Sequence, residues 1–213
     1  MAELLVKVKH FQHWLMLIPL ILVGRWFSWL EIKITKPEYL LYIHLDDYIP
    51  FVPLFVIPYI FWYAYVTIPA VFLFFKSPQE FAKMAAFLTL GMMIACAVYT
   101  LFPNGQALRP VLGNYDEPLV SLIRFIYSND TPANCAPSIH VVYSVAAYIA
   151  VSRYNNLRWH ARWIKNTSLI MAVLCILSTV FIKQHSIIDL VMGLFLSALL
   201  YLLIYGRQTI RPW

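Results

Sequence analysis

Two histidines and one aspartate are the residues of this sequence best suited to chemistry. His185 and Asp189 are four residues apart, so on a helix they share one face. The carboxylate can then accept a hydrogen bond from one ring nitrogen and leave the other nitrogen free to act as a nucleophile toward phosphorus. His140 is a second imidazole, suited to protonating a departing alkoxide. The spacing therefore predicts His185, Asp189 and His140 as catalytic residues.

Positive charges and a helix start accompany the histidines. Arg109 and Lys183 supply two cations for the non-bridging oxygens of a phosphate group. Pro137 is typical of a first helical position, where open N–H groups, including that of Ser138, would face an anion. We expect Arg109, Ser138 and Lys183 to bind a substrate phosphate. Two alternatives stay open: Ser138 also suits a helix cap, and Lys183 also suits contact with lipid head groups.

The composition places the elements that carry these residues in a bilayer. Hydrophobic residues make up 62% of the chain, charged residues 12%, and the mean hydropathy is +0.70, more apolar surface than a soluble fold of 213 residues hides. The 16 Lys and Arg residues stand between apolar runs rather than in one patch, so the formal charge of +6 does not indicate nucleic acid as a partner. No low-complexity stretch divides the chain, which predicts one membrane domain over residues 1–213, with the catalytic motifs within 102–190.

The cysteines do not indicate a metal site. Cys96, Cys135 and Cys175 are odd in number and lack the spacing of a disulfide framework or a zinc site. The cysteines therefore predict no zinc site, and nothing in the sequence indicates a cofactor.

Six apolar segments are long enough to cross a bilayer, which takes ~20 residues at ~1.5 Å each. The expected fold class is all-α, a polytopic membrane protein whose six transmembrane helices span roughly residues 11–30, 50–75, 80–102, 136–153, 163–182 and 185–206. Arg109 follows the third segment, His140 begins the fourth and His185 begins the sixth, so all three return to one membrane face. Polar residues that gather within a bilayer usually indicate a functional site.

The distribution of Lys and Arg predicts the orientation. One face receives ten of them and the other five, which places both termini in the cytoplasm and the site at the outer face. Arg25, Trp26 and Trp29 occupy the place of a signal-peptide cleavage site, so we expect a retained first helix. This topology suits a bacterial inner membrane, with the phospholipid bilayer and a membrane lipid substrate as partners.

Three strings in this order are similar to the signature motifs of the type 2 phosphatidic acid phosphatase family. They are Leu108-Arg109-Pro110, Ala136-Pro137-Ser138-Ile139-His140 and Lys183-Gln184-His185-Ser186-Ile187-Ile188-Asp189. The resemblance covers about residues 80–206. It implies His185 as nucleophile, Asp189 as its orienting carboxylate, His140 as general acid, Arg109 and Ser138 as phosphate binders, and no metal ion.

The sequence departs from the motifs of this family at three positions. Phe102 stands where the family usually has Lys, Ile139 where it has Gly, and Thr179 where it has Arg. This looser pattern resembles the branch of inositol phosphorylceramide and sphingomyelin synthases, in which a lipid hydroxyl replaces water as acceptor. Three functions stay open. The first is a lipid phosphatase that hydrolyses a phosphomonoester or diphosphate through a phosphohistidine. The others are a phosphotransferase that moves a phosphorylated head group to a lipid alcohol, and a non-catalytic lipid carrier.

Three further features carry weaker expectations. Asp46 and Asp47 precede the second span and are expected to be solvated, with binding of an acceptor head group as the alternative. Arg25 lies within the first span, where an Arg indicates a protein partner or a watery cavity unless it reaches the interface. Residues 118–128 are expected to form an amphipathic stretch that packs at the membrane interface.

Overall fold

The protein is mainly helical in the computed structural model, which describes residues 12–113, 117–154 and 161–206. The α-helices of this described part are α2 (Leu17–Lys33), α3 (Leu45–Tyr48), α4 (Val56–Lys76), α5 (Pro78–Leu101), α6 (Pro118–Asn129), α7 (Ile139–Arg153), α8 (Ala161–Phe181) and α9 (Ile187–Tyr205). Two short 3-10 helices, η1 (Gln12–Met16) and η2 (Pro53–Phe55), precede α2 and α4.

One feature departs from the expected all-α class. β1 (Tyr39–Leu40) and β2 (Asn104–Gly105) form a short parallel pair in which Tyr39 faces Asn104 and Leu40 faces Gly105. Strands of two residues carry no periodicity that a sequence could reveal. The pair ties the loop after α2 to the loop after α5.

Five helical segments are long and apolar enough to cross a membrane: His13–Lys33, Pro53–Lys76, Pro78–Leu101, Ala161–Phe181 and Ile187–Tyr205. Large apolar side chains such as Leu22, Ile68 and Phe195 are exposed on their outer faces, as a lipid environment requires. The chain is therefore built as a membrane protein.

The fourth expected span is shorter than the other five. α7 has 15 residues, about 22 Å at ~1.5 Å per residue, against about 30 Å of hydrocarbon. The count of six crossings and the orientation of the chain stay predictions. Lys7, Lys9, Arg158, Arg207 and Arg211, which enter the charge count, lie outside the described residues.

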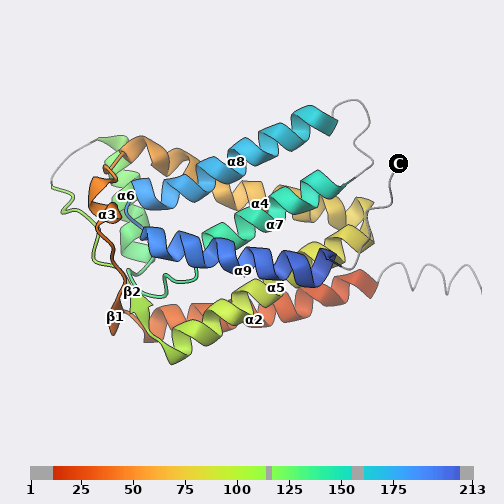
Figure 1. Cartoon of the computed structure of the whole chain (residues 1–213), viewed down its shortest axis with the longest axis horizontal. Helices are drawn as coiled ribbons and strands as arrows, with labels where there is room; N and C mark the ends of the chain where they lie inside the picture. The colour runs from red at the N-terminus through yellow and green to blue at the C-terminus, as the bar shows by residue number, and fades with distance from the viewer. Residues whose placement is uncertain (1–11, 114–116, 155–160, 207–213) are drawn as a thin grey trace, which may run out of the picture.

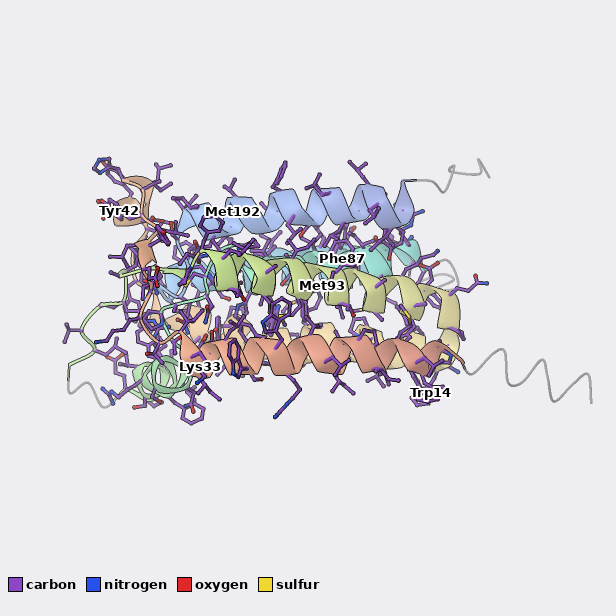
Figure 2. The ribbon with its side chains drawn as sticks, turned by 90° about the horizontal axis from the view of Figure 1, so that it is seen from below. Trp14, Lys33, Tyr42, Phe87, Met93 and Met192 are labelled. Atoms are coloured by element: carbon purple, nitrogen blue, oxygen red, sulfur yellow. The ribbon has the colours of Figure 1, made fainter. Side chains whose placement is uncertain are left out.

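The elements are arranged so that loops and short helices gather at one end of the bundle (Figure 1). α2 begins and α9 ends at the opposite end. Figure 2 shows Trp14 and Lys33 toward the two ends of α2, with Tyr42 at the same end as Lys33. α6 covers the expected amphipathic stretch and lies across this end, with Val120 and Ile123 buried.

α7 is the central helix, in contact with α4, α5, α8 and α9. Its buried residues include the small side chains of Ser144, Ala146, Ala147 and Ala150. Gly193 of α9 lets the neighbouring helix approach closely, because an added β-carbon there would lie 2.8 Å from Cβ of Val141 and 3.0 Å from the carbonyl oxygen of Ser138. Close approach through small residues is the usual basis of helix packing in membranes.

This close approach gives a testable prediction. Gly193→Ala should lower the free energy of unfolding by about 1–3 kcal/mol, because the added methyl group meets a branched side chain and a backbone oxygen. Gly24→Ala is the matched control, since nothing lies within 4 Å of its added β-carbon. Thermal unfolding in detergent measures both variants. Equal unfolding midpoints for Gly193→Ala and Gly24→Ala would show that the contact between α7 and α9 is not tight.

Candidate active site

His185 lies between a carboxylate and a second imidazole. Its Nδ1 is 3.0 Å from Oδ2 of Asp189, and its Nε2 is 3.4 Å from Nδ1 of His140. Asp189 is fully buried and His185 is 8% exposed. The three predicted catalytic side chains are therefore brought together.

The way Asp189 reaches His185 differs from the expected shared helix face. His185 precedes α9, whose N-cap is Ser186, and Asp189 is the third residue of the helix. Asp189 Oδ2 accepts the backbone N–H of Ser186 at 3.0 Å, which completes a capping box. The same carboxylate oxygen thus caps the start of α9 and contacts the imidazole of His185.

A tight turn after α8 places His185 at this point. Lys183 has a left-handed backbone, φ 56°, an uncommon conformation for a residue other than glycine. The backbone N–H groups of Gln184 and His185 both donate to the carbonyl oxygen of Thr179, at 2.8 and 3.0 Å. Thr179 is fully buried and donates its own hydroxyl to Ile176 O. Thr179, at the position where the family usually has Arg, therefore stabilises the turn and carries no charge.

His140 is held by aromatic rings. Its ring centroid lies 4.4 Å from that of Trp62 and 4.9 Å from that of Tyr59. Trp62 Nε1 also donates to the backbone carbonyl of His140 at 3.2 Å. Within the described residues, Nε2 of His140 is buried and has no hydrogen-bond partner. This nitrogen is available to a substrate.

Asp46 was expected to be solvated, and this prediction is wrong. It is 1% exposed, and its carboxylate accepts hydrogen bonds from Ser186 Oγ at 2.7 Å and from the backbone N–H of Ile187 at 2.9 Å. A carboxylate at a helix N-terminus satisfies open N–H groups and faces the positive end of the helix dipole. Asp47 is exposed as expected and accepts a hydrogen bond from Tyr42.

Arg109 lies beside the site but uses its donors on the protein. Its guanidinium group donates to the carbonyl oxygens of Asp130 at 2.8 Å and Thr131 at 3.0 Å, and to the side chain of Gln184. It also stacks on the ring of Tyr127, 4.5 Å from the ring centroid. Its Nε is buried without a partner among the described residues. Its contact with phosphate stays a prediction.

Ser138 and Lys183 are also engaged in local contacts. Ser138 is the N-cap of α7, its Oγ accepts from Val141 N at 3.5 Å, and its own N–H, which was expected to be open, donates to Asp189 O at 3.2 Å. Lys183 Nζ donates to the carbonyl oxygen of Asp46 at 2.8 Å. Their phosphate-binding roles stay predictions.

Two buried side chains that the sequence did not single out hold the site loops. Asn104 donates from Nδ2 to Ala136 O at 2.9 Å and accepts the N–H groups of Cys135 and Ala136 at Oδ1, next to the cis peptide bond before Pro137. Gln106 donates to the carbonyl oxygen of Lys183 at 3.0 Å. Asn104-Gly105 shows only the composition of a turn, so no sequence signal indicated this function.

A cavity of about 520 Å³ opens beside the two histidines. Besides His140 and His185, its wall includes the carboxylates of Glu31 and Asp130. Aromatic rings form much of the remaining wall: Phe27, Tyr59, Trp62, Tyr63, Tyr99 and Phe125. Its size and apolar lining suit part of an organic substrate.

Asp130 is linked to His185 through the residue that precedes this histidine. Its Oδ2 accepts hydrogen bonds from Tyr59 at 3.0 Å and from Gln184 Nε2 at 3.1 Å. Burial raises the pKa of the Asp130 carboxyl, and the bond from Tyr59 and the nearby His185 and Arg109 lower it in part. The sequence did not reveal Asp130 because its partners are distant in the chain.

Three side chains meet closely enough to be considered as metal ligands. Ligand atoms of Cys135, His185 and Asp189 all lie within 4.8 Å of one another. Burial, followed by the charge of Asp189, raises the pKa of the Cys135 thiol well above its ordinary value. In the structure the Cys135 thiol donates to the carbonyl oxygens of Pro132 and Ala133, and His185 Nδ1 is paired with Asp189 Oδ2, so these atoms already have protein partners.

The comparison with known families agrees with this geometry. The family described as "PAP2 superfamily" matches residues 106–212, which include Arg109, both histidines and Asp189. No curated protein and no solved structure matches the chain. Because the match covers half of the sequence and contains the whole His140, His185 and Asp189 cluster, this chain belongs to the PAP2 superfamily.

Proposed function

We propose that this protein is an integral membrane lipid phosphatase in which His185 is the nucleophile. Membership of the PAP2 superfamily implies phosphatase or phosphotransferase activity on phosphate esters. The observation that carries the proposal is the orientation of His185, whose Nδ1 is bound by Asp189 while Nε2 faces His140 at the cavity. An imidazole held at one nitrogen by a carboxylate has the correct tautomer to attack through the other.

The proposed reaction has two displacements at phosphorus. In the first, Nε2 of His185 forms a bond to phosphorus, the bond between phosphorus and the lipid oxygen breaks, and His140 gives a proton to that oxygen. In the second, His140 takes a proton from water, the water oxygen bonds to phosphorus, and the bond to His185 breaks. Inorganic phosphate leaves, and both histidines return to their starting state.

The phosphate is proposed to bind between the histidines and Arg109. A phosphate oxygen would find the buried, unpartnered Nε of Arg109. Phosphate oxygens bind a guanidinium group more strongly than neutral carbonyl oxygens do, so they can displace the present partners of Arg109. Ser138 and Lys183 are proposed to assist from the start of α7 and from the turn before α9.

The substrate is proposed to enter from the bilayer with its apolar chains still in lipid. Leu122, Phe125 and Ile126 of α6 line the cavity together with Ile60 and Tyr63 of α4. Such a wall accommodates acyl chains, while the polar end of the cavity meets the histidines. We propose, from the charge count of the loops, that this end faces outward from a bacterial inner membrane.

The nucleophile gives the second prediction. In mixed micelles with phosphatidate, His185→Ala should lower phosphate release by about 1,000-fold or more, as expected when a nucleophile is lost. His44→Ala is the matched control, because this exposed histidine is at the start of α3 and does not line the cavity. Equal turnover in wild type and His185→Ala would remove the proposed nucleophile.

Chelation gives the third prediction, since the proposed reaction needs no metal ion. Phosphate release should be unchanged after dialysis against EDTA. Cys135→Ser should likewise keep its activity in the presence and absence of the chelator, because the thiol has no role in the two displacements. A loss that zinc restores in wild type but not in Cys135→Ser would instead assign a metal to Cys135, His185 and Asp189.

A second candidate is a lipid phosphotransferase, in which an alcohol replaces water in the second displacement. Two observations favour it: Phe102 is 57% exposed and Thr179 is fully buried, where relatives usually carry cations. Product analysis with and without a lipid alcohol separates the candidates. A new phospholipid that appears only with the alcohol identifies a transferase, and free phosphate under every condition identifies a phosphatase.

A further inference from the structure

The charge of the cavity wall does not match a ligand that is only an anion. Among the described residues, the wall contains the carboxylates of Glu31 and Asp130 and no Lys or Arg. Arg109 and Lys183 contact residues near the cavity but do not line the cavity themselves. The wall that Glu31 and Asp130 form is therefore suited to positive charge.

Both carboxylates are held by neutral groups. Glu31, in the last turn of α2, accepts hydrogen bonds from Asn134 Nδ2 at 2.6 Å and from Thr131 Oγ1 at 3.0 Å. Asp130 accepts from Tyr59 and Gln184. In the described part of the chain, neither carboxylate forms an ion pair with a Lys or Arg. Both carboxylates are partly buried and repel each other, and Arg109 offsets the charge of Asp130 only in part.

Asn134 supplies independent evidence for a missing donor. This residue is 6% exposed, has a left-handed backbone with φ 57° and lines the same cavity. Its Nδ2 donates to Glu31, so its Oδ1 must be an acceptor, and this oxygen has no hydrogen-bond partner among the described residues. A buried acceptor without a donor is uncommon in folded proteins and indicates a group that the bound state would supply.

The rest of the wall also suits a cation. The rings of Phe27, Tyr59, Trp62 and Tyr63 line the cavity, and the faces of such rings attract positive charge. A protonated primary amine has three N–H donors. Glu31, Asp130 and Oδ1 of Asn134 supply three acceptors in the same cavity lining. Their number and kind match the three N–H donors of the amine.

We propose that the cavity binds a protonated primary amine carried by the substrate close to its phosphate, so that the substrates are phosphate esters of amino alcohols. The phosphate meets His185 and His140, and the amine meets Glu31, Asp130 and Asn134. The amine stays protonated and takes no part in the two displacements. This substrate class rests on the proposed function, whereas amine binding is measurable without turnover.

The turnover experiment compares two lipids with the same chain length. Sphinganine 1-phosphate carries an amine beside the phosphate, and octadecyl phosphate does not. The ratio of their kcat/KM values should favour the amine by about tenfold in wild type, the equivalent of one charge-assisted hydrogen bond. Glu31→Gln, which keeps the shape but removes the charge, should bring the ratio close to one. Glu38→Gln, an exposed glutamate, is the matched control and should keep the preference.

A binding experiment separates this inference from the proposed function. Quenching of tryptophan fluorescence, with Trp62 in the cavity wall, reports the affinity of His185→Ala protein for each lipid. Tighter binding of the amine that Asn134→Ala weakens supports the amine site even if wild type turns over neither lipid. Turnover of both lipids with equal kcat/KM and equal affinity overturns the amine site and leaves the phosphatase intact.

Discussion

The start of α9 is the constraint on which the rest of the site depends. A helix N-terminus buried in a bundle must satisfy its open N–H groups, and here Ser186, Asp189 and Asp46 do so. The capping carboxylate of Asp189 is also the partner of His185. Helix capping and imidazole orientation are therefore one interaction, and a substitution that weakens the cap also releases the ring.

The polar groups around this helix start divide into two sets. Arg109 and Lys183 donate hydrogen bonds to backbone carbonyl oxygens just after α6 and within α3, while Glu31 and Asp130 line the cavity. The nearby cations therefore fix loops, and the side chains that line the cavity carry negative charge. This distribution is the basis of the proposed amine site, and it is the reason that the proposed phosphate site would require Arg109 to exchange its partners.

The sequence predicted the elements better than the contacts between them. Apolar length revealed the long helices, and the ordered motifs revealed His140, His185 and Asp189, because both signals are local in the chain. Asp46 was misjudged because its partner Ser186 is 140 positions away, and no period or spacing links the two. Glu31 and Asp130 were missed for the same reason. Their proposed role depends on a cavity formed by α2, α4, α6 and the loop before α7.

The shortness of α7 explains where the site can exist. α4, α5, α8 and α9 have 19 to 24 residues, whereas α7 has 15 and lies among them. The space beyond its N-terminus is therefore bordered by longer helices and closed by α6, so polar groups there avoid lipid. A longer α7 would fill this space with apolar side chains. The shortness of α7 thus provides the room for the cavity beside His140 and His185.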